Sequence, residues 1–549
     1  MSTVLDVVIT EKSFGNKSLM SNVKFTVGAR EKVGVVGRNG AGKSTLFGIL
    51  AGTDKDYTGD VIFRRGSVVP TTAQAHIGLS DVPVIGYILN GLPEYEKLQN
   101  IINTYPETMG DDIEKIEIFS QALDKFNTLG YYHIEDKVKE EMRAFQLDGA
   151  IDKTMSQLSG GQKRLVEVIK VMHANADIAL IDEPTNHMDY VAKEQFVSWM
   201  KGAGEAMLVI THDRDVLEHV DRIIELKDGV MHTYNGNYDA YLKQNATKTA
   251  TGMSDFEQVE KRIKNLETKV LDYQRLKEKS RNPSTIQKFK RLEQQSREEL
   301  SQLKQMEKPS FWIDRSSVDA LDYKSADRYE KFKAKNIKMN VKENDSRSTH
   351  LLARVDNLSL AYGDNVVVEG VSFILNERER LEIRGRNGAG KSSVIKALLG
   401  SEDAPEVVSG EMFLDKQVRI GLYHQEIHET YLPLPLDGAI ERMYLDRELS
   451  ISDTKIRNLL SDYLFTEGDR KTPLSRLSGG QKARFQIISM LASEPQLLIL
   501  DEPTNHLDLP SIEELENALS KYTGAVLFVS HDSYFRKSLK SDMVMVGGK

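Results

Sequence analysis

The sequence predicts an α/β protein in which one kind of domain occurs twice, with a helical segment between the two copies. Three observations support this fold class. Four short motifs recur in the same order, apolar runs typical of buried parallel strands precede several of them, and about a hundred residues of different composition separate the copies. The length of 549 residues agrees, because a single hydrophobic core stops growing beyond roughly 250–300 residues.

The composition excludes several classes of protein. The chain has 40% hydrophobic and 28% charged residues and a net charge of −9, which argues against a surface that binds nucleic acid everywhere. It contains no cysteine, so disulfides, thiolate zinc sites and cysteine nucleophiles are excluded. No apolar run approaches the roughly 18 residues of a membrane span, and the first residues do not resemble a signal peptide. We therefore expect a cytoplasmic protein without membrane contact.

The repeated motifs place the two copies in one register. They are, in the first and then the second copy, GRNGAGKS[ST] at 37–45 and 385–393, LSGGQK at 158–163 and 477–482, DEPTNH at 182–187 and 501–506, and a strand ending in His-Asp at 213 and 532. In both copies 24 residues separate the leucine of LSGGQK from the aspartate of DEPTNH, and 30 residues separate that aspartate from the later histidine. A duplicated domain explains this spacing, and both copies keep every motif.

The glycine-rich motif follows an apolar strand and leads into a helical pattern, which is the context of a phosphate-binding loop. Its glycines let backbone N–H groups converge on phosphate oxygens, and the helix N-terminus adds a positive dipole. We expect Lys43 and Lys391 to reach the β- and γ-phosphates, and Ser44 and Ser392 to coordinate Mg²⁺. The predicted nucleotide-binding residues of the two loops are Gly37, Asn39, Gly40, Ala41, Gly42, Lys43, Ser44, Thr45, Gly385, Asn387, Gly388, Ala389, Gly390, Lys391, Ser392 and Ser393.

A pair of carboxylates ends the apolar run before Pro-Thr-Asn-His in each copy. Ligand-binding residues occupy such positions at the C-terminal ends of strands in open α/β sheets. Asp182 and Asp501 are placed to hold Mg²⁺ through water, and Glu183 and Glu502 to orient or deprotonate an attacking water. The alternative is a pair of surface carboxylates that only closes a strand, and the repetition of the whole motif argues against it.

The later histidines and the LSGGQ motif allow two interpretations each. His212 and His531 end apolar strands and could be ordinary core residues, but their equal distance from the carboxylates favours contact with the γ-phosphate. LSGGQ is a Ser-Gly-Gly turn before a helix with basic residues. It could be a simple helix cap or a second anion site at a helix N-terminus.

Together these motifs resemble the ATP-binding cassette (ABC) superfamily over most of the chain. The resemblance implies two P-loop NTPase nucleotide-binding domains in head-to-tail contact, which form two composite ATP sites within a monomer. The first site would join the first loop to Gln74, Asp182, Glu183, His212, Ser478, Gly479, Gly480 and Gln481. The second would join the second loop to Gln425, Asp501, Glu502, His531, Ser159, Gly160, Gly161 and Gln162. Gln74 and Gln425 would also be Mg²⁺ ligands, and Phe14 and Tyr362 would stack on adenine.

Tandem cassettes, the absence of a membrane domain and the helical linker are similar to the ABC-F branch, as is DEPTNH in both copies. This resemblance implies ribosome binding near the exit site, with the linker extended towards the peptidyl-tRNA. The expected domains are a first cassette at 1–242 with a helical insertion at about 92–150, a linker at 243–350 and a second cassette at 351–549. The first cassette departs from the family pattern at His-Met-Asp (187–189) and in the segment before Gln74.

The linker sequence predicts an antiparallel helical hairpin. Its first helix carries an apolar stripe with alternating spacings of three and four, formed by Phe256, Val259, Ile263, Leu266 and Val270. Asn-Pro-Ser at 282–284 indicates a helix stop and restart, and a second helical pattern continues to Met306. We therefore expect the tip of the hairpin near 279–286.

Positive charge gathers around this tip. The segment 261–291 has 11 Lys and Arg against three acids, inside a chain of net negative charge. A solvated helix face is the alternative, but such a face would mix the two signs more evenly. Excess positive charge suits the phosphate backbones of rRNA and tRNA. The candidates for RNA contact are Lys277, Lys279, Arg281, Lys288, Lys290 and Arg291.

Two further segments have weaker signals. The stretch 92–150 of the first cassette carries 13 acids against six bases, which fits a basic protein surface or a solvated helical subdomain better than RNA. Residues 308–339 hold Trp312 and several other aromatic residues, and we expect them to pack the linker onto the cassettes.

The sequence as a whole predicts an ABC-F-type ATPase with ATP and Mg²⁺ as cofactors. ATP would close the cassettes, the closed form would bind the ribosome, and hydrolysis would release it. A DNA-repair or chromosome ATPase is the first alternative, although such proteins tend to have zinc modules or longer coiled coils. The ATPase subunit of a transporter is the second. Both a housekeeping translation factor and an antibiotic-protection factor fit the sequence.

Overall fold

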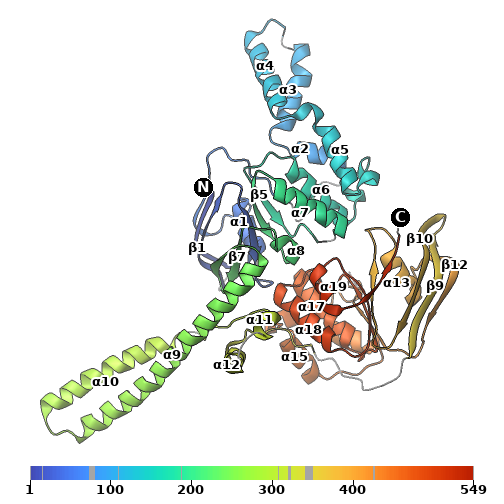
Figure 1. The fold of residues 1–549 in the computed structure, drawn as a ribbon. Coiled ribbons are helices and arrows are strands. Elements are labelled where there is room, and N and C mark those ends of the chain that lie inside the picture. The colour runs from blue at the N-terminus through green and yellow to red at the C-terminus, as the bar shows by residue number, and fades with distance from the viewer. Residues whose placement is uncertain are drawn as a thin grey trace. The chain divides into compact units, whose positions relative to one another are not determined.

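The computed structural model describes residues 2–14, 17–72, 81–108, 110–186, 188–306, 308–319, 323–339, 350–423 and 427–547. The chain forms two compact units. The two-cassette unit comprises Met1–Tyr238 and Ile337–Lys549, and the linker unit comprises Asp239–Asn336. Figure 1 shows both cassettes as sheets covered by helices and the linker as a long hairpin, which confirms the predicted fold class.

A five-stranded sheet forms the centre of the first cassette. Its strands, in spatial order, are β5 (Ile178–Asp182), β6 (Ala206–Ile210), β3 (Lys32–Val36), β7 (Arg222–Lys227) and β8 (Val230–Asn235). The first four are parallel and β8 is antiparallel to β7. Every residue of β3, β5 and β6 is buried, as the continuous apolar runs predict for parallel strands covered on both faces.

The two faces of this sheet contact different parts of the cassette. Alternate residues of a strand point to opposite faces. Ile178 and Leu180 pack with helix α1 (Lys43–Leu50) and with an antiparallel sheet of β2 (Lys17–Gly28), β1 (Thr3–Phe14) and β4 (Thr58–Phe63). Ala179 and Ile181 pack with helices α6 (Gly160–Met172) and α7 (Tyr190–Gly202). The nucleotide motifs thus begin at strand ends between two apolar cores.

Helices make up the extra residues of the first cassette. Helix α2 (Val84–Asn90) precedes the predicted insertion, and α3 (Tyr95–Thr108), α4 (Ile113–Thr128) and α5 (Ile134–Ala144) lie within it. Tyr95, Phe126 and Tyr131 pack ring against ring with centroid distances of 5.3–5.8 Å and hold α3 and α4 together. Figure 1 shows α3 and α4 side by side, away from the sheet. Their acidic side chains lie mostly on the surface.

The second cassette repeats this arrangement. Its parallel sheet has the order β13 (Ile420–Tyr423), β14 (Leu497–Asp501), β15 (Ala525–Val529), β11 (Arg380–Arg384) and β16 (Asp542–Met545). Its antiparallel sheet has the order β10 (Asn365–Asn376), β9 (Leu351–Tyr362) and β12 (Glu406–Leu414). The helices are α13 (Lys391–Leu399), α14 (Leu436–Leu445), α15 (Asp453–Asp462), α16 (Glu467–Arg470), α17 (Gly479–Leu491), α18 (Leu509–Lys521) and α19 (Ser533–Leu539).

The linker unit contains the hairpin of α9 (Tyr238–Lys279) and α10 (Pro283–Lys304). Ion pairs join the two helices, with Arg262 at 2.8 Å from Glu299 and Lys304 at 2.7 Å from Glu267. The turn lies at 280–282, inside the predicted tip, and the Asn282 side chain accepts a hydrogen bond from the Ser284 N–H at 3.0 Å. This cap, followed by proline at the first helical position, explains the sharp restart of the helix.

Residues 310–334 pack within the linker unit, mainly against α9. This segment contains α11 (Arg315–Asp319) and α12 (Tyr323–Phe332). Ile313 and Phe332 form an apolar cluster with Met253 of α9, and a Cβ atom on Gly252 would lie 2.6 Å from the Phe311 ring. Ile337 instead packs in the core of the second cassette. The expected packing on a cassette is therefore seen at Ile337, and for residues 310–334, which belong to the linker unit, it stays a prediction.

No helix within the described ranges has both the length and the apolar character needed to cross a membrane.

Candidate active sites

Each glycine-rich loop joins a central strand to a helix, β3 to α1 and β11 to α13. Gly42 and Gly390 precede the helices with φ of 104° and 87°, a conformation that residues with a side chain rarely adopt. A Cβ atom on Gly390 would also lie 2.3 Å from Val368. Lys43 Nζ donates to the Gly37 carbonyl at 2.7 Å, and burial lowers the pKa of Lys43. The lysine thus lies over a loop whose backbone, at a helix N-terminus, is suited to bind an anion.

The carboxylate pairs lie at the ends of β5 and β14. Glu183 and Glu502 follow the strands with φ of 46° and 51°, a strained conformation for glutamate that is typical of functional sites. Ser392 Oγ donates to Asp501 Oδ2 at 2.8 Å, so the hydroxyl and the carboxylate predicted to hold Mg²⁺ lie together. Burial and the neighbouring Glu502 raise the pKa of Asp501 to about 6. Burial also raises the pKa of Glu183.

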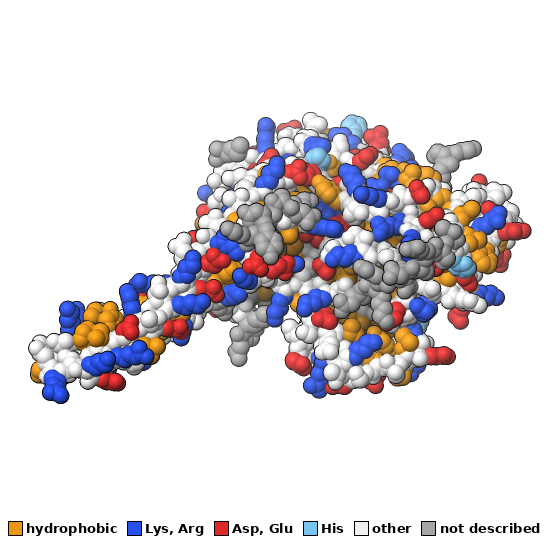
Figure 2. All heavy atoms as spheres, turned by 60° about the horizontal axis from the view of Figure 1, so that its bottom comes forward, with side chains coloured by type: hydrophobic (Ala, Val, Ile, Leu, Met, Phe, Trp, Pro, Cys, Tyr) orange, Lys and Arg blue, Asp and Glu red, His pale blue; other side chains and the backbone are white. Residues whose placement is uncertain are grey.

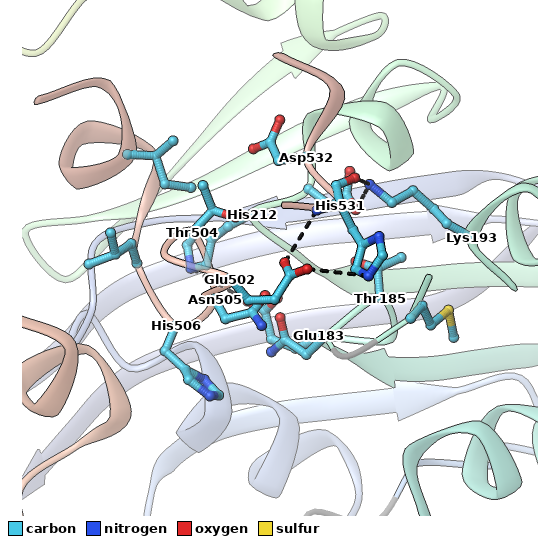
Figure 3. A pocket seen from close by; sticks show the side chains of 15 residues that line it. Glu183, Thr185, Lys193, His212, Glu502, Thr504, Asn505, His506, His531 and Asp532 are labelled. Atoms are coloured by element: carbon cyan, nitrogen blue, oxygen red, sulfur yellow. Dashed lines mark hydrogen bonds and ion pairs between the residues drawn. The ribbon is translucent and has the colours of Figure 1, made fainter. Parts of the chain in front are cut away.

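The two histidines contact the glutamates, as Figure 3 shows for the second cassette. His212 Nε2 lies 3.4 Å from Glu183 Oε1, and His531 Nε2 lies 3.2 Å from Glu502 Oε1. The His531 backbone N–H donates to Glu502 Oε2 at 3.2 Å. Burial lowers the pKa of both histidines to about 3, so both imidazoles are neutral at pH 7. A neutral imidazole can offer one N–H donor while its other nitrogen accepts.

There are two cavities, and each is lined by one glycine-rich loop and by the LSGGQ motif of the opposite cassette. A cavity of about 470 Å³ is lined by Lys43, Ser44, Glu183 and His212 together with Ser478, Gly479 and Gly480. A larger one of about 680 Å³ is lined by Lys391, Ser392, Glu502 and His531 together with Ser159, Gly160, Gly161 and Gln162. Each cavity is therefore lined by residues that were predicted for one composite site and that come from both cassettes.

The LSGGQ serines cap helices and also face the opposite loop. Ser159 accepts a hydrogen bond from the Gln162 N–H at 3.3 Å, and the Gln162 side chain accepts one from the Ser159 N–H at 3.0 Å. Ser478 and Gln481 repeat this capping box. Because the helix N-termini line the two cavities, the helix-cap and anion-site interpretations are compatible.

Four of the predicted residues are not placed in a site by the structure. Gln74 and Gln425 lie outside the described residues, and so does the side chain of Phe14. Tyr362 is 44% exposed and donates to the Asp403 carbonyl at 3.3 Å. Among the described residues that line the second cavity, Val367 of β10 is present and Tyr362 is not.

Comparison with known proteins agrees with this geometry. The sequence model described as ABC transporter matches residues 20–186 and 368–505, and a second model of the same description matches 224–285. The putative ATP-binding protein YdiF of Bacillus subtilis is 31% identical over 541 residues, which are 97% of this chain and 78% of that protein. The ABC transporter F family member 5 of Arabidopsis thaliana is 26% identical over 547 residues, 97% and 74% of the two chains.

The chain belongs to the ABC-F family. A further relative is the energy-dependent translational throttle protein EttA of Mycobacterium tuberculosis, 28% identical over 535 residues, which are 95% of this chain and 88% of that protein. Two ABC cassettes in tandem bind and hydrolyse ATP. The ABC-F chain is thus an ATPase, as the motifs predict.

Sequence reasoning missed two aspartates that complete the sites of this ABC-F protein. Asp508 Oδ2 accepts a hydrogen bond from the Asn39 N–H, and Asp189 Oδ2 accepts one from the Asn387 N–H, each at 2.9 Å and each across the cassette interface. Burial opposes ionisation of Asp189, but N–H donors hold its pKa below the ordinary value. A signal was present in the sequence, because both aspartates lie seven residues after the first carboxylate of DEPTNH.

Proposed function

We propose that this ABC-F ATPase binds the ribosome when ATP has closed its cassettes, acts on translation through its linker, and leaves after hydrolysis. The observation that carries the proposal is a basic hairpin tip on the linker that joins two cassettes, which together line two ATP-site cavities. The name of the relative EttA, a translational throttle protein, supports a role in translation. Because one chain supplies both halves of both sites, we propose that the protein acts as a monomer. We also propose that it acts in the cytoplasm.

The charges of the tip support contact with nucleic acid. Lys277 pairs with Glu293 at 2.5 Å. Five other tip cations are exposed and form no ion pair within the part of the chain that the structure describes, namely Lys279, Arg281, Lys288, Lys290 and Arg291. Figure 2 shows Lys and Arg side chains on the surface of the hairpin. Cations without acidic partners are suited to phosphate groups, and the backbones of rRNA and peptidyl-tRNA offer a dense array of them.

We propose the following roles at the ATP sites. Lys43 and Lys391 bind the β- and γ-phosphates, and Glu183 and Glu502 orient or deprotonate the attacking water. His212 and His531 contact the γ-phosphate and hold the glutamates in place. Each LSGGQ helix N-terminus approaches the same nucleotide from the opposite cassette.

The residues present fit Mg²⁺, since Ser392 and Asp501 bring a hydroxyl and a carboxylate within 2.8 Å of each other. Mg²⁺ prefers such hard oxygen ligands and would neutralise charge on the phosphates. The residues proposed to hold it are Ser44, Asp182, Ser392 and Asp501, with Gln74 and Gln425.

Ribosome binding is tested with a variant in which both proposed catalytic glutamates are glutamine, E183Q/E502Q. Because this variant should bind ATP without hydrolysing it, we expect it to stay closed and to move with ribosomes in a sucrose gradient of lysate containing ATP. The same variant with ADP serves as the control and should stay at the top. A protein that stays at the top with ATP would contradict the translation proposal.

Neutralising the five unpaired tip cations with glutamine should weaken ribosome binding and flatten its salt dependence. The slope of log K against log salt should change by about 0.7–0.9 for each phosphate that the tip no longer neutralises. A matched control neutralises Arg262, Arg297 and Lys304, which already pair with acids in the hairpin. Equal slopes for the tip variant and the unmodified protein would identify the tip as a solvated helix face.

A further inference from the structure

Four consecutive residues of the second cassette, from His531 to Tyr534, are each held by a side chain of the first cassette. We call the four side chains of the first cassette the clamp. Lys193 Nζ donates to the His531 carbonyl at 2.7 Å, and Arg214 Nη2 donates to Asp532 Oδ2 at 3.0 Å. Asp215 Oδ1 accepts from Ser533 Oγ at 2.5 Å, and Glu218 Oε1 accepts from Tyr534 OH at 2.8 Å. All four lie inside the two-cassette unit.

Lys193 is the member of the clamp nearest to the reaction. Its side chain is 7% exposed and lines the cavity shown in Figure 3, which is also lined by the two glutamates proposed as catalytic and by both histidines. Burial lowers the pKa of Lys193, but Asp213 at 2.9 Å and Asp215 at 3.0 Å outweigh this effect and raise the pKa above its ordinary value. The ammonium is therefore charged and fixed in position by three acceptors.

The hydrogen bond that Lys193 makes across the cassette interface ends at a residue of the second ATP site. Its acceptor is the carbonyl of His531, the residue whose backbone N–H and ring both contact Glu502. A displacement of this backbone by about 1 Å would move both groups that hold the glutamate, and misplacement of that size can reduce a rate about a hundredfold.

The first turn of α7 thus reaches both sides of the second site. Asp189 caps this helix and accepts from the N–H of Asn387 in the second glycine-rich loop. Lys193, one turn later, donates to His531. Both contacts require the two cassettes to be together, so closure and the alignment of Glu502 depend on the same helix.

The first site cannot be built in the same way. The residue four positions after Asp508 is Ile512, which has no polar side-chain group to bind a carbonyl. The counterpart of Arg214 is Ser533, which is short and uncharged. Both cations of the clamp therefore belong to the first cassette, and the pseudo-symmetry of the sites is broken at this point.

We propose that Lys193 is a positioning residue for the second composite site, which aligns His531 and Glu502 only when the cassettes close, and that the first site lacks this device. The two sites then differ in their dependence on Lys193. This inference rests on the proposed roles of Glu183 and Glu502. It explains by the clamp how two sites with nearly identical motifs would differ.

The test compares K193M in two single-site backgrounds of the full chain. E183Q leaves hydrolysis to the second site, and E502Q leaves it to the first. In the E183Q background, K193M should lower kcat about tenfold or more while KM for ATP changes less than about threefold, because alignment is lost and the nucleotide ligands remain. In the E502Q background the loss should be several times smaller. K193R keeps the charge and should restore part of the rate.

K201M, at the exposed end of the same helix, is the matched control and should leave both rates nearly unchanged. Equal losses from K193M in the two backgrounds would mean general damage to cassette pairing and would overturn the inference. No loss in the E183Q background would overturn it as well. The double variant E183Q/E502Q tests the assignment of the two glutamates separately, because substantial hydrolysis by it would overturn that assignment.

Discussion

Hydrolysis of ATP by the E183Q/E502Q variant is expected to fall by about 10²–10⁴-fold in kcat, the range that general-base catalysis contributes. Glutamine has the shape of glutamate but cannot accept a proton. Both glutamates lie at the strand ends beside the two cavities, within 3.4 Å of His212 and 3.2 Å of His531 respectively. Release of inorganic phosphate under saturating ATP measures the effect.

Binding of ATP by this variant should persist, because the glycine-rich loops are unchanged. A fluorescent ATP analogue measures it. E402Q, an exposed glutamate of the second cassette, is the matched control for the loss of one carboxylate and should hydrolyse at the normal rate. If the double variant kept more than about a tenth of the rate, another group would have to act as the base.

The substitution G480A is expected to lower hydrolysis at the first site by about tenfold or more. A Cβ atom at this position would lie 2.0 Å from Asn39 Nδ2 of the opposite glycine-rich loop, so the closed interface would have to open. Asn39 also donates to Asp508 through its backbone and to the His506 carbonyl through its side chain, each at 2.9 Å, so it cannot shift without breaking these hydrogen bonds. A displacement of about 1 Å is enough for an effect of this size.

The measurement uses the E502Q background, in which the first site alone is active. G204A is the matched control, because a Cβ atom on this exposed glycine meets nothing within 4 Å. A G480A protein with normal activity would show that the interface does not close as tightly during turnover as it does in this structure.

Much of the fold follows from local pattern. The runs before the glycine-rich loops and before DEPTNH are continuous and apolar, and β3 and β5 are buried at every residue. The hairpin follows from the apolar stripe and from Asn282 and Pro283, whose preferences for helix starts act within a few residues. Such signals are short-range, so one sequence suffices to detect them.

Other features depended on contacts between distant residues. Lys277 looks like its neighbours in the tip, yet Glu293 of the facing helix neutralises it. Most of the segment 308–339 packs on α9, because Phe311 fits against Gly252 and the resulting cluster with Met253 buries its apolar side chains. No sequence pattern within the hairpin tip or within residues 308–339 identifies the residues that they contact.

The repeated motifs were enough to predict two α/β cassettes, two phosphate-binding loops and the glutamates beside them, because each of these is specified by neighbours in the chain. The difference between the two sites required the folded interface. Lys193 and Ile512 are ordinary helix residues until α7 and α18 are placed against the opposite cassette. Only in the folded interface does the buried ammonium of Lys193 lie 2.7 Å from the carbonyl of His531, a residue 338 positions later in the chain.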